Sequence, residues 1–218
     1  MPRLQTVSVV DALAATLRAG VLDGVPAAGA PLAETDVAAR YGVSRPTAKA
    51  ALAALAHEGL LRRTANRPAH VPRLTAADVR DVYRVRIPLE LEVVRHVAER
   101  RPLAGAALAV ARLRDLPADP PASAFVTADL AFHRSLVEAV ASPRLERVYG
   151  LLLGEIHLSM VQAERAVGRE RITDDHTGIL ESLQAGDAAE AGRRMRTHLE
   201  HSRDALAELL DAQSELVA

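Results

Sequence analysis

Cysteine is absent from this 218-residue chain, and aromatic residues make up only 2% of it. The lack of cysteine excludes disulfides, thiolate metal sites and cysteine nucleophiles, so any metal ligand must be His, Asp or Glu. Because aromatic side chains are so few, aliphatic side chains and alanine must fill the interior. This composition implies closely packed helices.

Long hydrophobic runs are also missing. No segment approaches the roughly 20 apolar residues needed to cross a bilayer. The apolar N-terminal stretch VSVVDALAATLRAGVLDG has a helical period and is interrupted by Asp11, so it does not resemble a signal peptide. We therefore expect a cytoplasmic protein with no membrane partner.

Positive charge is concentrated in the first third of the chain, which holds the single lysine, Lys49. Residues 1–75 carry nine Lys plus Arg against five Asp plus Glu, whereas residues 76–218 carry 18 against 23. This asymmetry indicates that one domain meets a polyanion such as DNA and the other does not. We expect a DNA-binding domain at 1–73, a linker at 74–77 and a second domain at 78–218.

The basic third carries the signals of two helices joined by a short turn. Gly42 can end the first helix, Ser44 can cap the second, and Pro46 falls in the first turn of that helix, where proline is tolerated. A stop at Gly59, two short extended runs and a turn around Asn66 to Pro68 follow. The pattern predicts a winged helix-turn-helix.

In a winged helix, the N-terminal part of the second helix enters the major groove of DNA. Side chains there face base edges or phosphates, and arginines beside the wing flank them. The alternative is a basic helical hairpin whose charges are only solvated. The predicted DNA-binding residues are Glu34, Ser44, Arg45, Thr47, Lys49, Arg62, Arg63 and Arg67.

The stretch LAETDVAARYGVSRPTAKAALAALAHEGLLRR resembles the GntR family of bacterial transcription regulators. It matches the family pattern of Leu-x-Glu, Gly-Val-Ser-Arg, a basic residue four positions later, Ala-Leu and Glu-Gly-Leu. Two positions depart from the pattern. Asn66 to Ala69 replace the usual Gly-Arg-Gly at the wing tip, and Ala33 replaces a capping Ser or Thr, which should weaken that helix start by about 1 kcal/mol.

From Thr75 onward the pattern is helical throughout. Thr75 and Asp78 can cap a first helix, which Pro88 should bend or restart. An antiparallel helical bundle is therefore predicted, so the fold is mainly α. Further helices are expected at about 103–115, 124–141, 144–165, 173–185 and 187–214, with a proline-rich connector at 117–124.

Four polar residues lie on otherwise apolar helix faces. Asp129 and His133 are four positions apart, so both side chains point into the same interior volume. His176 and His198 lie on the apolar stripes of two later helices. His201 instead shares a face with charged residues and should be solvated.

Burying these four groups without partners is costly, on the order of 1 to 3 kcal/mol for each polar group and more for a charge. A divalent cation would satisfy three imidazoles and one carboxylate at once. The alternative is an Asp–His pair with two hydrogen-bonded core histidines. Spacing alone leaves both interpretations open, because one Asp-x-x-x-His is a weak signal.

Residues 78–218 resemble the FCD domain, the all-helical ligand-sensing half of the FadR-type subfamily of GntR regulators. The matching segments are VRIPLE, DLAFHRSLVEAVASPRL and HTGILESLQAGDAAEAGRRMRTHL, in family order. One departure is Pro143-Arg144, where the family often has an asparagine. The resemblance implies a metal set of Asp129, His133, His176 and His198.

Three histidines and one aspartate can close a tetrahedral zinc site or leave positions open around a nickel, manganese or iron ion. An open site could bind a small carboxylic acid whose other end is held by a buried arginine. The resemblance places Arg86 beside this pocket, although Arg86 could equally form a salt bridge with Glu90. Glu90 and His157 are further effector-binding candidates, and each also admits a structural role.

These observations predict a DNA-binding transcription regulator, a repressor rather than an activator, that binds an operator as a homodimer and responds to a small carboxylate effector. No catalytic residue is assigned. One alternative is a metal-sensing regulator or a structural metal site without an organic effector. Another is a metal-dependent hydrolase, but no second acid or base stands at a suitable spacing.

Overall fold

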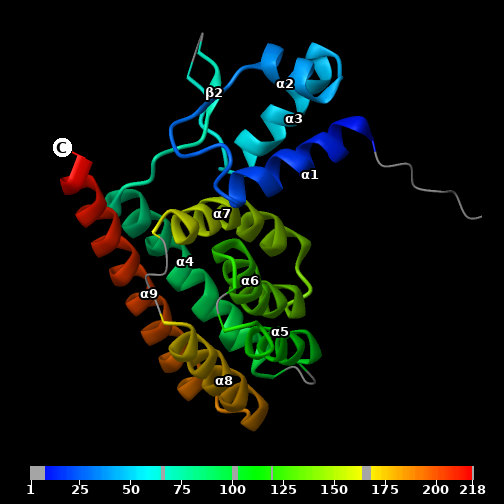
Figure 1. Cartoon of the computed structure of the whole chain (residues 1–218). Helices are drawn as coiled ribbons and strands as arrows, with labels where there is room; N and C mark the ends of the chain where they lie inside the picture. Colours follow the sequence, from blue (N-terminus) through cyan, green and yellow to red (C-terminus); the bar gives the residue numbers. More distant parts are fainter. Residues whose placement is uncertain (1–7, 65–66, 100–102, 119, 164–167, 218) are drawn as a thin grey trace, which may run out of the picture. The chain divides into compact units, whose positions relative to one another are not determined.

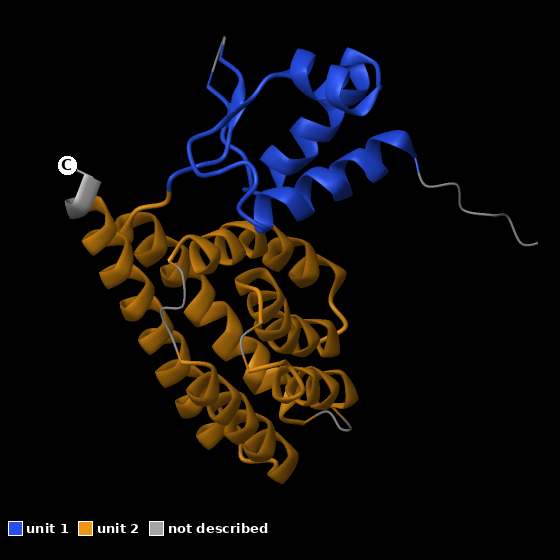
Figure 2. Ribbon diagram, in the orientation of Figure 1, with its two compact units in different colours: residues 1–73 blue, residues 74–218 orange. Residues whose placement is uncertain are grey.

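The computed structural model describes residues 8–64, 67–99, 103–118, 120–163 and 168–217. Within these ranges the chain forms nine helices and two short strands (Figure 1), which confirms the mainly α fold. It divides into two compact units, residues 1–73 and residues 74–218 (Figure 2). The segment 74–77, expected as a linker, is part of the second unit. No helix among the described residues is both long and apolar enough to cross a membrane.

The first unit contains α1 (Val9–Leu22), α2 (Glu34–Tyr41) and α3 (Arg45–His57). Gly42 ends α2 in the left-handed conformation, with φ of 63°. Ser44 caps α3, because its hydroxyl accepts a hydrogen bond of 3.2 Å from the amide of Thr47. Ala33 provides no side-chain cap for α2, as its small side chain requires. The helix-turn-helix therefore forms at the positions that the local signals indicate.

An ion pair fixes the first helix of this unit to the end of α3. The guanidinium of Arg18 donates two hydrogen bonds of 2.6 Å to the carboxylate of Glu58, which follows the last residue of α3. Leu17 and Val21 of α1 and Leu55 of α3 are buried, and α1 packs against α3. The apolar contact and the paired charges together hold α1 against α3.

The strands of the first unit pair differently from a simple two-stranded wing. β1 (Pro31–Leu32) pairs antiparallel with β2 (Ala69–His70), whereas Arg62 joins β2 only through a single bridge to His70. The prediction missed β1 as the main partner of β2. Pro68 precedes β2 and has no amide to donate, which limits the pairing with the segment after α3. Asn66, at the expected tip, lies outside the described residues.

In the part of the second unit that the structure describes, helices are the regular elements and no strand forms. Its first helix starts at a capping box, in which the hydroxyl of Thr75 accepts from the amide of Asp78 and the Asp78 carboxylate accepts from the Thr75 amide. The helices are α4 (Ala76–Val97), α5 (Ala104–Arg114), α6 (Ala122–Ala139), α7 (Pro143–Gln162), α8 (Arg169–Ala185) and α9 (Ala188–Val217).

Helix α4 runs without interruption through Pro88, so the expected restart at this residue does not occur. Proline removes the amide that would bond the carbonyl four residues earlier, here that of Arg84. Both Arg84 and Pro88 are exposed, so water can reach that carbonyl. The break in the hydrogen-bond ladder is therefore tolerated on the solvent side of the helix.

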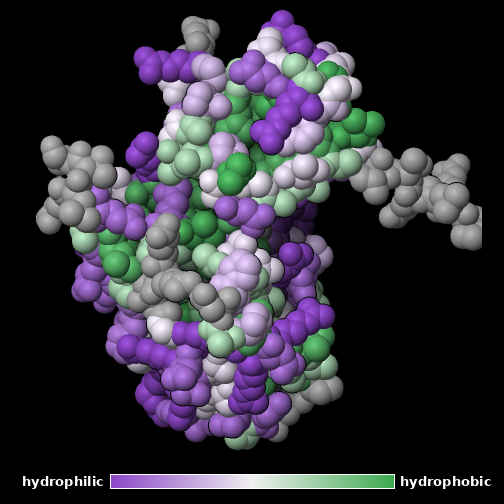
Figure 3. Space-filling model, in the orientation of Figure 1, coloured by the Kyte–Doolittle hydropathy of each residue, from purple (hydrophilic) through white to green (hydrophobic). Residues whose placement is uncertain are grey.

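Packing in the second unit pairs α4 with α9, α5 with α6, and α8 with α9. The buried side chains are mostly aliphatic, and Tyr83, Phe132 and Tyr149 are the aromatic ones buried among the described residues. Hydrophilic side chains dominate the visible surface where α8 meets α9 (Figure 3). Because the buried side chains are mostly aliphatic, the few buried polar residues lie in an apolar interior.

Candidate metal centre and nucleic-acid interface

Three helices bring the four polar residues from the apolar faces together. Asp129 and His133 lie one turn apart on α6, His176 lies on α8, and His198 lies on α9. All four are buried, with exposed fractions between 0% and 3%. His201, three positions after His198 and therefore turned partly away from its face, is exposed, as expected from its charged face. The helical period thus separates the inward histidine of α9 from the outward one.

The ligand atoms of this cluster are spaced as they would be around one cation. All four lie within 4.8 Å of one another. The Nε2 atom of His176 is 3.1 Å from that of His133, 3.3 Å from that of His198 and 3.4 Å from Oδ1 of Asp129. Metal–nitrogen bonds of about 2.0 to 2.1 Å separate neighbouring ligands by about 3.4 Å in a tetrahedron and about 2.9 Å in an octahedron. The three separations from His176 fall within or at the edge of this range, and the four atoms as a set spread over up to 4.8 Å.

Two carboxylates outside the cluster orient two of the imidazoles. Nδ1 of His133 lies 2.5 Å from Oε2 of Glu90, and Nδ1 of His198 lies 3.2 Å from Oδ2 of Asp175. A carboxylate at Nδ1 assigns the proton to that nitrogen and leaves the Nε2 lone pair directed toward the cluster. This is the arrangement typical of histidines that bind a metal.

Glu90 is held in its charged form. Burial opposes that charge, but the guanidinium of Arg86 and the imidazole of His133 outweigh it and keep the pKa of the Glu90 carboxyl well below its usual range. Nε of Arg86 donates to Oε1 of Glu90 at 2.6 Å, and the hydroxyl of Tyr149 donates to the same oxygen at 2.9 Å. Glu90 is therefore a fixed anchor for His133.

Nε2 of His176 faces more acceptors than it can satisfy, because a single N–H donates to one of them at a time. His133 and His198 direct Nε2 toward His176, and Oδ1 of Asp129, 3.4 Å from His176, makes no hydrogen bond. Burial, helped by His198 and His133, holds the pKa of His176 well below its usual range, and burial also lowers that of His133. Neutral imidazoles and a buried carboxylate oxygen without a partner are the donor set that a divalent cation satisfies. The four residues therefore fit such an ion.

His176 differs from the other two histidines in its surroundings. Its ring stacks on Phe132, with centroids 4.3 Å apart and planes inclined by 18°. Its Nδ1 atom is buried and has no hydrogen-bond partner. Apolar stacking, not a carboxylate, therefore sets the orientation of this imidazole.

We expect Asp175→Asn to weaken metal binding about 10- to 100-fold, because loss of an outer carboxylate lowers the basicity and the fixed orientation of a ligating histidine. Isothermal titration with Zn²⁺ would measure the change. Asp174→Asn is the matched control, since Asp174 is the exposed neighbour of the partly buried Asp175. Equal zinc affinities for the two variants would show that Asp175 does not support His198.

Several residues of the site escaped the sequence analysis. Asp175, Tyr83 and Tyr149 were not singled out, although Asp175 directly precedes His176 and the two tyrosines are among the few aromatics of the chain. Two tyrosines on apolar faces of helical segments were a usable signal. Tyr83 contacts Arg86 three positions later on the same helix, a spacing that a helical pattern allows. The bond from Tyr149 to Glu90 joins α7 to α4, which no local pattern reveals.

Among the effector candidates, Arg86 keeps a donor available. Its Nε bonds Glu90 and its Nη1 donates to the hydroxyl of Tyr83 at 3.0 Å, but Nη2 is buried and has no partner. The salt bridge to Glu90 therefore exists and does not use the whole guanidinium. Both oxygens of Glu90 are bonded to other side chains, which gives Glu90 a structural role beside its candidacy as an effector contact. His157 lies partly buried on α7.

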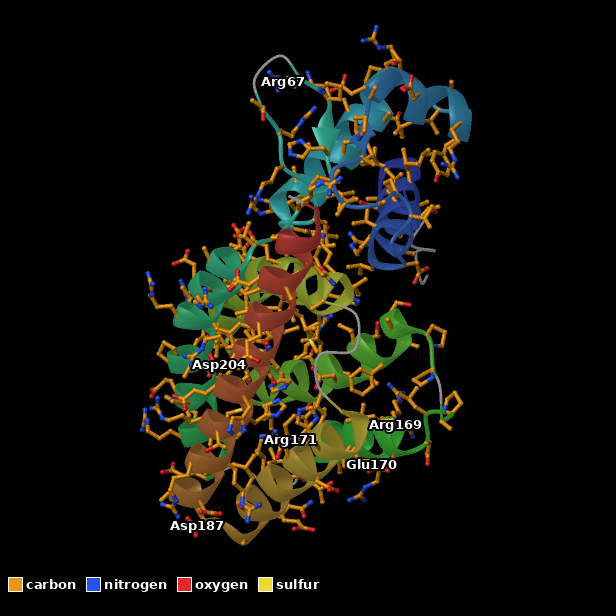
Figure 4. All side chains as sticks on the ribbon, turned by 60° about the vertical axis from the view of Figure 1, so that its left-hand side comes forward. Arg67, Arg169, Glu170, Arg171, Asp187 and Asp204 are labelled. Carbon is orange, nitrogen blue, oxygen red and sulfur yellow. The ribbon has the colours of Figure 1, made fainter. Side chains whose placement is uncertain are left out.

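The candidate DNA-binding residues lie on α3 and beside β2. Arg45 and Lys49 are exposed on α3, Ser44 caps that helix, and the hydroxyl of Thr47 lies 2.8 Å from that of Ser44. Arg62 and Arg67 are exposed, and Arg67 lies on the loop that leads into β2 (Figure 4).

Glu34 is the one acidic member of the candidate set. Its carboxylate accepts a hydrogen bond of 2.8 Å from Arg63. Glu34 therefore neutralises and orients Arg63.

Family models match both units of the chain. The model for the bacterial regulatory proteins of the gntR family matches residues 9–71, and the model for the FCD domain matches residues 81–201. The second match alone covers more than half of the 218 residues. It contains all four residues of the buried cluster.

Relatives of known description agree with these matches. An HTH-type transcriptional regulator named BphR, uncharacterized, from Paraburkholderia xenovorans is 28% identical over 209 residues, which cover 89% of this chain and 84% of that protein. A probable D-xylose utilization operon transcriptional repressor from Paenarthrobacter nicotinovorans is 27% identical and covers 78% of this chain and 76% of its own length.

Solved structures share the fold over almost the whole chain. A transcriptional regulator described as GntR from Rhodococcus sp. RHA1 is 28% identical, with a TM-score of 0.82 over 94% of this chain and 99% of that one. McbR/YncC of E. coli has a TM-score of 0.78 at 18% identity, over 93% and 99% of the two chains. The protein is thus a DNA-binding transcription regulator, not an enzyme, and it belongs to the GntR family of bacterial regulatory proteins, with an FCD domain as its second unit.

Proposed function

We propose that this regulator binds a divalent metal ion through Asp129, His133, His176 and His198, and that a small carboxylate effector bound beside the ion controls operator affinity. The observation that carries the proposal is the convergence of four buried ligand atoms within 4.8 Å. Zinc is the first candidate because neutral imidazoles and a carboxylate suit it, and nickel, manganese and iron are compatible with the same donors.

Arg86 is proposed to hold the effector. Its guanidinium is buried and paired with Glu90, so its position is fixed before any ligand arrives. The Nη2 group without a partner can donate to a carboxylate, and a bound metal ion supplies the second positive contact for such an anion. His157 on α7 stays a candidate for a further contact with the effector.

The DNA interface is proposed to be the N-terminal part of α3 and the arginines beside β2. Arg45, Thr47 and Lys49 would face base edges or phosphates in the major groove, while Arg62, Arg63 and Arg67 would contact the flanking backbone. Ser44 and Glu34 would act by fixing the start of α3 and the side chain of Arg63.

A homodimer is proposed as the operator-binding form, because two recognition helices can then read two half-sites on one face of the DNA. Repression is the proposed sign, in keeping with the description of the Paenarthrobacter relative. An effector whose affinity for the two states differs by about 1 to 3 kcal/mol would change operator occupancy about 5- to 150-fold.

A thermal-shift series with small mono- and dicarboxylates, run with zinc and with a chelator, tests the effector. We expect at least one acid to raise the unfolding temperature, and this increase to vanish on chelation and in an Arg86→Met variant. Binding that survives both changes would contradict the proposed site. If zinc alone changes operator binding and no acid adds to it, the protein is a metal sensor.

We expect Lys49→Ala to weaken specific DNA binding by about 1 to 3 kcal/mol if the lysine reads a base, or to reduce affinity uniformly and lower the salt dependence if it contacts a phosphate. The duplex would be one selected by the wild type from a random-sequence pool, and binding would be measured at several salt concentrations. Ala50→Ser is the matched control at the exposed neighbouring position. A Lys49→Ala protein with wild-type affinity would exclude Lys49 from the interface.

A further inference from the structure

One glutamine at the end of α7 contacts the segment that follows the DNA-binding unit. The amide of Leu74, the first residue after that unit, donates to Oε1 of Gln162 at 3.0 Å. Leu74 itself is buried, with 7% of its surface exposed. The start of the second unit is therefore anchored by a side chain 88 positions later in the sequence.

The same glutamine also joins the last helix. Nε2 of Gln213 on α9 donates to the main-chain carbonyl of Gln162 at 3.3 Å. Gln162 is the last residue of α7, and carbonyls at a helix C-terminus have no partner within their own helix. Gln162 thus connects three segments: the residue next to the DNA-binding unit, the end of α7 and the end of α9.

Each of these segments belongs to, or directly precedes, a helix that carries a residue of the buried cluster or of its hydrogen-bond network. Helix α4 starts two residues after Leu74 and carries Arg86 and Glu90. Tyr149, which bonds Glu90, lies on α7, and His198 lies on α9. At a rise of about 1.5 Å per residue, Gln162 and Gln213 are roughly 20 Å along their helices from Tyr149 and His198. Helices of this length transmit a displacement as nearly rigid bodies.

We propose that Gln162 is a positioning residue that transmits the state of the metal and effector site to the DNA-binding unit through the amide of Leu74. This inference rests on the proposed function, since it needs a site whose occupancy affects DNA binding. A shift of α7 or α9 on loading moves the Gln162 side chain, and the bonded Leu74 amide moves with it. The hydrogen bond between Leu74 and Gln162 would thus have two arrangements, and occupancy of the metal and effector site would favour one of them.

The test compares operator affinity with zinc and with a chelator, using a duplex selected by the wild type. The ratio of the two dissociation constants measures the coupling, for which 5- to 150-fold is typical. Gln162→Leu lacks the acceptor for the Leu74 amide, and we expect its ratio to fall to within about twofold of one, with zinc affinity unchanged. Gln162→Glu keeps an oxygen acceptor and is expected to retain the wild-type ratio.

Two further variants separate transmission from stability. Arg80→Ala removes the 3.3 Å pair between Arg80 of α4 and Asp211 of α9, which ties α4 to α9 without contacting Leu74 or Gln162, and should keep the ratio. Gln213→Leu removes only the α9 contact and should give an intermediate ratio. This second variant serves if Gln162→Leu does not fold.

Three outcomes would overturn the inference. A wild-type ratio in Gln162→Leu would show that the coupling bypasses this residue. An equal loss in Arg80→Ala would reduce the effect to general stability. A ratio of one between the wild-type dissociation constants would show that zinc does not control DNA binding at all. That result would contradict the proposed function itself, and it is obtained before any variant is made.

Discussion

Zinc is expected to raise the unfolding free energy of the second unit by about 4 kcal/mol when its free concentration is about 1,000 times its dissociation constant. The ligand atoms are already gathered within 4.8 Å, so binding favours the folded state over the unfolded chain. For a domain of this size the increase corresponds to roughly 8 to 16 °C in Tm. Calorimetry or circular dichroism at increasing free zinc would measure it.

His176→Ala should abolish most of this stabilisation. His176 stands at the centre of the cluster, with three other ligand atoms 3.1 to 3.4 Å from its Nε2. Loss of a metal ligand is expected to weaken zinc binding by more than 100-fold, which is the upper figure for losing a carboxylate that only supports a ligand. At the same free zinc concentration the stabilisation then falls below about 1.4 kcal/mol.

His201→Ala is the matched control for this prediction, because His201 is exposed on α9 while His198 on the same helix is buried. It should keep the full increase in Tm with zinc. Comparing each variant with and without zinc removes the cost of the substitution itself. An undiminished zinc response in His176→Ala would place the binding site elsewhere.

Glu90→Leu is expected to lower the free energy of unfolding by about 3 to 5 kcal/mol in the absence of metal. The substitution leaves the guanidinium of Arg86 buried without its counter-charge, which is the costly way to break a buried ion pair. It also removes the acceptor of the Tyr149 hydroxyl and of Nδ1 of His133. Urea unfolding with a chelator present would measure the change.

The double variant Arg86→Met with Glu90→Leu should recover part of that loss, because an apolar pair of similar volume often replaces a buried ion pair at little cost. Recovery will be incomplete, since Tyr149 and His133 still lack their acceptor. The wild type, the two single variants Arg86→Met and Glu90→Leu, and the double variant form a double-mutant cycle. A coupling energy near zero would show that the two charges do not stabilise each other.

The proposed effector site would give Arg86 a part in both stability and recognition. Glu90 fixes the guanidinium by one nitrogen and His133 by its Nδ1, and the remaining Nη2 stays available to a ligand. An anion bound there would add a second partner to a charge that is already buried. Under the proposed function, the stability of the unit and its response to an effector would depend on the same side chains.

Local signals in the sequence placed most helices and several of their ends, although α8 begins at Arg169, before the expected start at 173, and α4 continues through Pro88. Ser44 and the pair Thr75 and Asp78 cap helices as expected, because capping depends on residues three positions apart. The inward direction of His133 and His198, against the outward direction of His201, also follows from the helical period alone. These features are encoded within a few turns of one helix.

Only the tertiary structure decided which faces meet and at what height along each helix. Asp129, His176 and His198 converge because α6, α8 and α9 pack in one particular register, and a shift of one turn, about 5.4 Å, would separate them. The bonds from Glu90 to His133 and from Gln162 to Leu74 cross 43 and 88 positions of sequence. The pairing of β1 with β2 is equally non-local. Such contacts depend on the sum of all packing between helices and strands, which no periodic pattern within a single segment contains.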